Sequence, residues 1–226
     1  ILLFNHNLSF NDNFIKIKKL LITYNFNIFS IFLIPKIYLN SFQPAGKWPK
    51  IEDLEKYNLE LNKSIPLISI CGGMVTNFTE LNRKKPSKNI NIISFSFTPI
   101  VHDASDYAIM ETPNTIPHIL KTLQKINSKS DIHIGPISLG MHYNPYGESL
   151  IKNTNFSRIE MTNNDMRHDS LLSLVWSVGI YQQMYNDKIK YLTFNNLFDE
   201  HGIYLKNYKK RPLYFLNEIF LSFAGK

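Results

Sequence analysis

The chain has 226 residues, of which 44% are hydrophobic and 19% are charged, with nine glycines and eleven prolines. This composition excludes disordered, collagen-like and low-complexity proteins. The single cysteine, Cys71, excludes an internal disulfide and a zinc site built from several cysteines. The net charge of +7 comes mostly from lysines scattered along the chain, so we expect a solvated surface and no nucleic-acid partner.

The longest apolar run, Ile28 to Pro35, is too short to span a bilayer, so we expect no association with a membrane. No stretch rich in Lys and Arg precedes an apolar segment near the first residue, which argues against a signal peptide and favours a cytoplasmic location. Because the chain begins with Ile1 rather than Met, we also expect it to be a piece of a longer protein.

Short apolar runs alternate with longer helical patterns along the chain. The first candidate is the Phe14–Tyr24 region, a possible sixth strand. Five clearer strands are apolar on both faces, as in parallel strands covered by helices: Ile28–Ile34, Pro66–Cys71, Asn91–Phe97, Ile132–Ser138 and Ile189–Phe194. The spacing of apolar residues predicts helices over Ile51–Leu61, Ile116–Ile126, Ser170–Tyr185 and Leu213–Phe223.

The alternation of strand, loop and helix predicts βαβ units and a parallel sheet. A closed (β/α)8 barrel usually takes about 250 residues. With five or six strands in sequence, we predict an α/β fold of this type that is incomplete on its N-terminal side. No repeat, linker or block of charge divides the chain, so we assign residues 1–226 to one domain.

Polar and titratable residues follow the predicted strands, where parallel α/β folds bind their ligands. We therefore predict one site at this edge of the sheet. Its candidate residues are, in chain order, Lys36, Tyr38, Asn77, Glu80, His102, Asp103, Asp106, His142 and Asn195.

Glu80 and His102 are the candidate catalytic residues. Glu80 needs partial burial to raise its pKa for work as a general base, and the alternative is that it caps a short helix after Thr76 or Thr79. His102, followed by Asp103, has the groups for acid–base chemistry. The alternative is that His102 bonds to its own loop and that Asp106 caps a helix.

Other familiar sites lack support. A metal site from His102, Asp103 and His142 has no HxH or HExxH spacing, so we expect no metal. The pair Gly72-Gly73 is followed by no phosphate-binding spacing, which favours a tight turn. Cys71 ends an apolar strand and is expected to be a small buried residue, and no GxSxG motif marks a nucleophilic serine.

The chain resembles one family from about Leu33 to Phe220, which is most of its length. The resemblance rests on six stretches in this order: LIPKIYLNSFQPAGKWP, GGMVTNFTELNRKKP, SFTPIVHDASDYAIMET, IHIGPISLGMHYNP, HDSLLSLVWSVG and RPLYFLNEI. The family is that of the D-apionate lactonases. The resemblance implies a TIM barrel related to glycoside hydrolases. It also implies hydrolysis of an aldonolactone derived from apiose, a carboxylic-ester hydrolase step in pentose catabolism, with no metal or organic cofactor.

The sequence departs from the family pattern after the strand that ends at Phe194. The family tends to place a glutamate there, whereas this chain has Asn195-Asn196, and the nearest acids are Asp199 and Glu200. In the related two-glutamate glycosidases this position carries the nucleophile. The departure bears on whether this chain is active.

Three functions remain open. In a lactone hydrolase, Glu80 or His102 would activate water, and Asn77, Lys36 or Tyr38 would stabilise the oxyanion. A glycoside hydrolase would use Glu80 with a second carboxylate, and a non-catalytic protein would only bind the sugar. In the first case the partner is a small sugar lactone. The sequence carries no signal for an oligomeric state, although we expect these residues on their own to aggregate or to dimerise because the predicted sheet has open edges.

Overall fold

The computed structural model describes residues 2–4, 8–24, 28–41, 49–155, 157–184 and 188–223. Six parallel strands form one sheet whose spatial order is their order in the chain. They are β1 (Leu2–Phe4), β2 (Ser30–Pro35), β3 (Ser69–Gly73), β4 (Ile92–Phe97), β5 (Asp131–Ile137) and β6 (Ile189–Phe194). Each strand lies beside its predecessor, as in a (β/α)8 barrel, and the predicted α/β class is confirmed.

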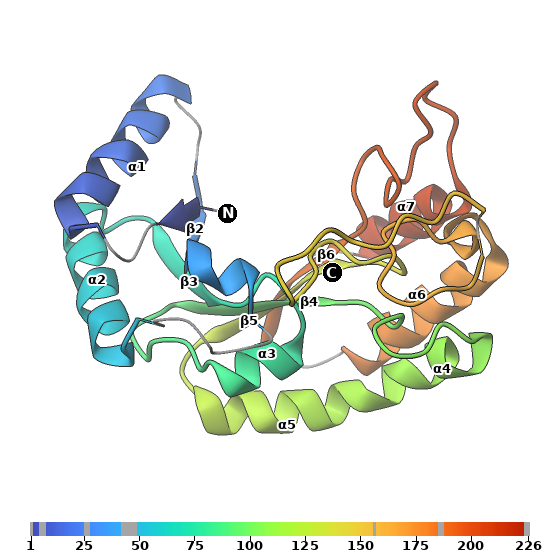
Figure 1. Ribbon diagram of the computed structural model, residues 1–226, viewed down its shortest axis with the longest axis horizontal. Helices are drawn as coiled ribbons and strands as arrows, with labels where there is room; N and C mark the ends of the chain where they lie inside the picture. Colours follow the sequence, from blue (N-terminus) through green and yellow to red (C-terminus); the bar gives the residue numbers. More distant parts are fainter. Residues whose placement is uncertain are drawn as a thin grey trace.

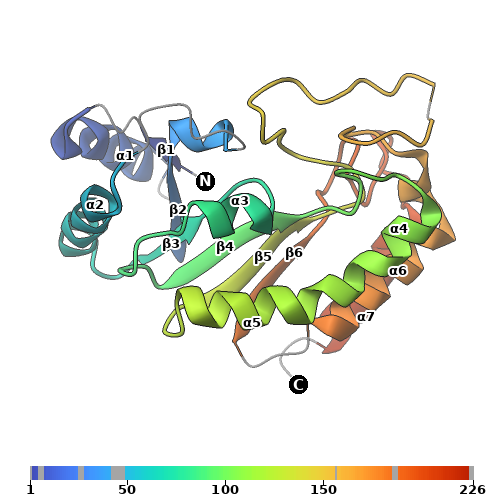
Figure 2. The same ribbon diagram turned by 60° about the horizontal axis from the view of Figure 1, so that its bottom comes forward.

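Helices connect successive strands and lie along an arc around the outside of the sheet (Figures 1 and 2). The α-helices are α1 (Phe10–Tyr24), α2 (Ile51–Ser64), α3 (Phe78–Arg83), α4 (Asp106–Glu111), α5 (Ile116–Ile126), α6 (Leu171–Gln183) and α7 (Pro212–Phe223). Three short 3-10 helices are η1 (Lys36–Leu39), η2 (Thr112–Thr115) and η3 (Met166–Asp169). None of the described helices is long and apolar enough to cross a membrane.

The prediction of a possible strand in the Phe14–Tyr24 region is wrong, because this region belongs to helix α1. The Ser9 hydroxyl accepts a hydrogen bond from the Asp12 backbone N–H at 3.1 Å, as residues before helices commonly do. Asn13 and Ile17, four residues apart, are both buried, which is the spacing of one helix face. The sixth strand exists, but it is β1, before this helix.

The core lies between the sheet and the outer helices. All residues of β4 are buried, and Ile93, Phe95 and Phe97 belong to the core cluster with residues of α5 and α6. Trp176 of α6 stacks near Phe97, with 6.3 Å between ring centroids. Strand β6 is less buried than expected, because among the described strands it has a neighbour on one side only.

Candidate functional site

The turn between β3 and α3 places Asn77 and Glu80 at the carboxyl end of the sheet. Asn77 precedes the first residue of α3 in an extended conformation. Its backbone N–H donates to Glu80 Oε2 at 3.1 Å, so Glu80 caps its own helix as a capping box requires. This bond fixes the direction in which the Glu80 side chain leaves the helix.

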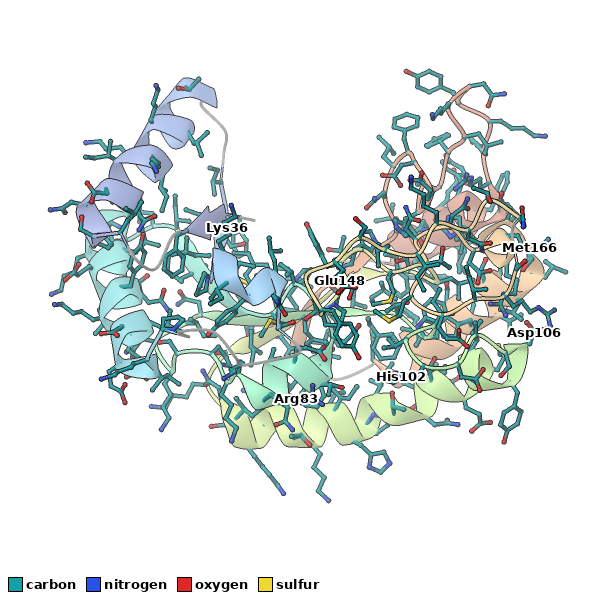
Figure 3. All side chains as sticks on the ribbon, viewed as in Figure 1. Lys36, Arg83, His102, Asp106, Glu148 and Met166 are labelled. Atoms are coloured by element: carbon teal, nitrogen blue, oxygen red, sulfur yellow. The ribbon has the colours of Figure 1, made fainter. Side chains whose placement is uncertain are left out.

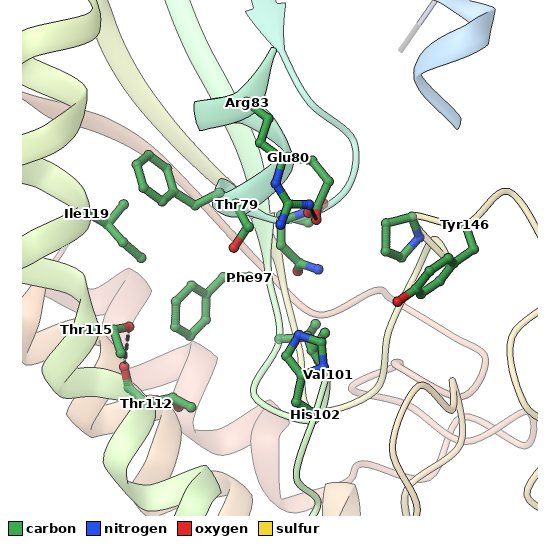
Figure 4. Close-up of a pocket in the computed structure, with 15 residues that line it drawn as sticks. Thr79, Glu80, Arg83, Phe97, Val101, His102, Thr112, Thr115, Ile119 and Tyr146 are labelled. Atoms are coloured by element: carbon green, nitrogen blue, oxygen red, sulfur yellow. Dashed lines mark hydrogen bonds and ion pairs between the residues drawn. The ribbon is translucent and has the colours of Figure 1, made fainter. Parts of the chain in front are cut away.

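A pocket of about 360 Å³ lies between α3, the end of β4, the start of α5 and the loop after β5. Figure 4 shows Glu80 and Arg83 extending into it, with His102 and Tyr146 on other walls. The apolar part of the lining comes from Phe78, Phe97, Val101, Ile119 and Pro145. The pocket therefore joins a polar wall to an apolar one, as small-molecule sites commonly do.

Glu80 carries the unusual electrostatics of the pocket. The residue is 5% exposed, and burial is the largest influence on its carboxyl group, raising the pKa above its ordinary value. Hydrogen bonds and the positive fields of Arg83 and His102 act in the opposite direction on this pKa. Arg83 Nη1 lies 3.7 Å from Glu80 Oε1. A buried carboxylate with a raised pKa, facing a pocket, has the properties of a general base.

His102 lies in the loop after β4, is exposed and lines the same pocket. Asp103 next to it lies outside the pocket lining and accepts a hydrogen bond from the Ser105 backbone N–H at 2.7 Å, which lowers the Asp103 pKa. Ser105, not Asp106, caps helix α4, because its hydroxyl accepts from the Ala108 N–H. The structure thus brings His102 to the pocket and uses Asp103 to shape the loop.

Asp106 holds two parts of the chain together. It forms ion pairs with Arg158 at 2.9 Å and with Arg167 at 2.7 Å. The buried Arg167 also pairs with Asp165 at 2.6 Å and donates to the Ala104 carbonyl oxygen at 2.7 Å. These bonds fasten the loop that carries His102 to the long connection between β5 and α6, and Asp106 does not line the pocket.

Lys36 and Tyr38 lie in η1, directly after β2, and neither lines the pocket. Figure 3 shows Lys36 on the side of β1 and β2, away from Arg83 and His102. Lys36 is exposed, whereas Tyr38 is buried and its pKa is raised to about 12 by that burial. The Tyr38 phenol therefore keeps its proton throughout the physiological range.

His142 and Asn195 also lie outside the pocket lining. The His142 ring stacks on His201, with 4.0 Å between centroids, and burial lowers the His142 pKa. Asn195 is buried, and its N–H donates to the Ile137 carbonyl oxygen at 2.9 Å. Its φ of 54° is left-handed, a conformation that asparagine adopts more readily than glutamate.

Comparison with known proteins shows to which family the chain belongs. The model of the D-apionate lactonase TIM barrel domain matches residues 2–222. The chain belongs to this family. A curated D-apionate lactonase from Brucella anthropi is 29% identical over 208 residues, which cover 89% of this chain and 34% of the relative. The chain thus spans about a third of the length of the curated relative that it matches.

Solved structures show the same fold at low identity. A GH2 β-galacturonidase from Eisenbergiella tayi, bound to galacturonate, has a TM-score of 0.57 at 9% identity, covering 92% of this chain and 36% of the other. A β-glucuronidase from Ruminococcus gnavus in complex with D-glucaro 1,5-lactone has a TM-score of 0.53 at 7% identity, covering 84% and 32%. The likeness to these glycosidases confirms the TIM-barrel type of this part of the D-apionate lactonase fold.

Arg83 and Tyr146 are polar pocket residues of this family member that the sequence analysis did not single out. Arg83 ends the NFTELNR stretch and lies about one helical turn after Glu80. This spacing indicates that the two side chains lie on the same side of the helix. Tyr146 comes from the long connection after β5, and no local pattern places it opposite α3. Among the described residues, no group of three or more His, Cys, Asp or Glu side chains is arranged to hold a metal ion.

Proposed function

We propose that this chain hydrolyses a sugar-derived lactone, the lactone of D-apionate, to the open acid, in the cytoplasm and as a step of apiose catabolism. The observation that carries the proposal is the pocket that joins the buried Glu80 to His102 and Asn77. Membership of the D-apionate lactonase family supports the substrate class. The Ruminococcus gnavus complex supports it too, since there a protein of this fold is bound to a sugar lactone.

Each pocket group takes one role in the proposed reaction. Glu80 Oε1, on the side of the carboxylate away from the capping bond, removes a proton from water while the water oxygen bonds to the lactone carbonyl carbon. The Asn77 side-chain amide donates to the oxyanion that forms on the carbonyl oxygen. The ring C–O bond then breaks, and the departing alkoxide takes a proton from His102. Glu80 afterwards gives up the proton that it took from water and His102 takes one up, so both groups return to their starting states.

The direct test is Glu80→Gln in the purified chain, with acid release from D-apionate lactone measured at constant pH. The amide removes basicity, so we expect a loss of about 10²–10⁴-fold in kcat. Little stability should be lost, because the amide oxygen still accepts the Asn77 N–H. Glu52→Gln in the exposed first turn of α2 is the matched control and should leave activity unchanged. Activity of Glu80→Gln within a few-fold of the parent would contradict the role given to Glu80.

Glycoside hydrolysis is the second candidate, because the structural relatives are glycosidases. That chemistry needs two carboxyl groups about 5–9.5 Å apart. Glu80 is the only acid among the described residues that line the pocket, which favours the lactone. Aryl glycosides separate the two functions, since the proposal expects no release of the aryl alcohol under conditions in which lactone is consumed.

A further inference from the structure

Arg83 is the one Lys or Arg among the described residues that line the pocket. It is the last residue of α3, and its side chain is 48% exposed. Its guanidinium approaches Glu80 Oε1 at 3.7 Å, which is longer than a hydrogen bond. The pocket therefore has a positive charge beside the candidate base, on a half-exposed side chain of the pocket lining.

The contact between Arg83 and Glu80 adds little to the stability of α3. The two residues are three apart in one helix and the Arg83 side chain is half-exposed, so solvent weakens their attraction. The Glu80 carboxylate is already held by the Asn77 N–H. Arg83 lies on the pocket wall, where its guanidinium can meet a ligand that enters the pocket.

Charge changes during the proposed reaction. A neutral lactone and a neutral water give a hydroxy acid, as one C–O bond forms and the ring C–O bond breaks. The acid then loses its proton to solvent and becomes a carboxylate. A product carboxylate in this pocket is repelled by Glu80 once Glu80 has released its proton. A guanidinium offers two parallel N–H groups to a carboxylate, a match that an ammonium group does not reproduce.

We propose that Arg83 forms a carboxylate-binding subsite of this pocket, which holds the open-chain hydroxy acid produced from the lactone. This inference rests on the proposed lactone hydrolysis and adds a consequence to it. The acid product competes with its own lactone for the pocket, so accumulated product slows turnover.

The test compares the binding of two probes, D-apionate and the uncharged polyol obtained by reducing it, using calorimetry on the purified chain. In Arg83→Gln we expect the Kd for D-apionate to rise about tenfold, the loss of one charge-assisted contact to a half-exposed group. The Kd for the polyol should stay unchanged. Arg83→Lys keeps the positive charge but loses the two parallel N–H groups, so its loss of D-apionate affinity should be smaller than that of Arg83→Gln. Thermal melting checks that both variants fold.

Lys85→Gln is the matched control, since it removes one exposed positive charge two residues away without touching the pocket. It should leave both affinities and the lactonase rate unchanged. A second measurement uses the pH profile of kcat/KM. Because Arg83 lowers the Glu80 pKa, Arg83→Gln should move the acidic limb of that profile to higher pH.

The outcomes separate this inference from the proposed function. D-apionate binding that weakens in Arg83→Gln, in a chain that hydrolyses no lactone, would support the subsite and contradict the hydrolase. Lactone hydrolysis with D-apionate affinity unaffected by Arg83→Gln would overturn the subsite and leave the hydrolase standing. A parent chain that fails to bind D-apionate at all would also overturn the subsite.

Discussion

Three histidines lie together in the loops at the carboxyl end of β5 and β6, and they make stability depend on pH. His142 stacks on His201, and His168 Nε2 bonds to the Gly202 carbonyl oxygen at 2.9 Å. His142 Nε2, His168 Nδ1 and His201 Nδ1 are buried and have no hydrogen-bond partner among the described residues. Burial is the main cause that lowers the pKa of all three, and the His201 pKa falls to about 3.

The sign of this pH dependence follows from the number of protons that the folded and unfolded states bind. In the unfolded chain a histidine takes up a proton below its ordinary pKa of about 6.5, whereas folded His201 takes one up only near pH 3. Between these limits the unfolded state binds more protons, so the free energy of unfolding falls as the pH falls. For His201 alone the loss between pH 7 and pH 5 is about 2 kcal/mol. His142 and His168 act in the same direction.

Urea denaturation at pH 7, 6 and 5 measures this loss in the parent and in His201→Gln. The variant has no titrating group at this position, so its stability should fall by about 2 kcal/mol less than that of the parent over this range. Only the difference in pH dependence matters, because the substitution also changes packing. His118→Gln, at an exposed position of α5, should follow the parent. Equal losses in the parent and in His201→Gln would refute the argument.

Three further predictions concern other parts of the chain. Asp106→Asn removes a charged partner of the buried Arg167 and should cost about 1–2 kcal/mol, seen by urea denaturation; an unchanged midpoint would show that Asp165 alone suffices. Asn195→Glu places a longer side chain at a φ of 54° and should cost about 1 kcal/mol in the same assay, whereas Asn195→Gly should be nearly neutral. Val175 and Phe215 are exposed apolar residues on α6 and α7, so we expect the chain to self-associate and Val175→Lys with Phe215→Lys to reduce this, as measured by sedimentation velocity.

The sheet was the part of the fold that the sequence predicted well. Strands β4 to β6 have bounds within one residue of the predicted ones, because each is a short apolar run between polar segments. Helix α5 has the predicted bounds. The error in α1 has a physical cause, since Ile15-Lys16-Ile17-Lys18 alternates as a strand does while the wider segment repeats as a helix. Only the longer window distinguishes the two periods.

Three of the nine candidate site residues line one pocket. Asn77 and Glu80 follow β3, and His102 follows β4. The three residues share the pocket because these two strands are neighbours in the sheet. Lys36 and Asn195 follow β2 and β6, farther along the same edge, and neither joins them. The parallel direction of the strands determines the edge at which a residue lies, and the strand order separates Lys36 and Asn195 along it. Its place along that edge depends on how the loops fold back through contacts that are distant in sequence.

The capping bond at α3 links the stability of this helix to the chemistry proposed for the pocket. Glu80 uses Oε2 to accept the Asn77 N–H, and this bond orients Oε1 toward the side on which Arg83 lies. A substitution by alanine would remove the cap and the base together, so a loss of activity would not distinguish them. The glutamine variant keeps an acceptor for the cap and removes the proton-accepting oxygen, which is why it separates the two roles. Burial makes the Glu80 carboxyl group costly to ionise and so raises its pKa. The hydrogen bond at Oε2 holds the group in place, so Oε1 keeps a fixed orientation.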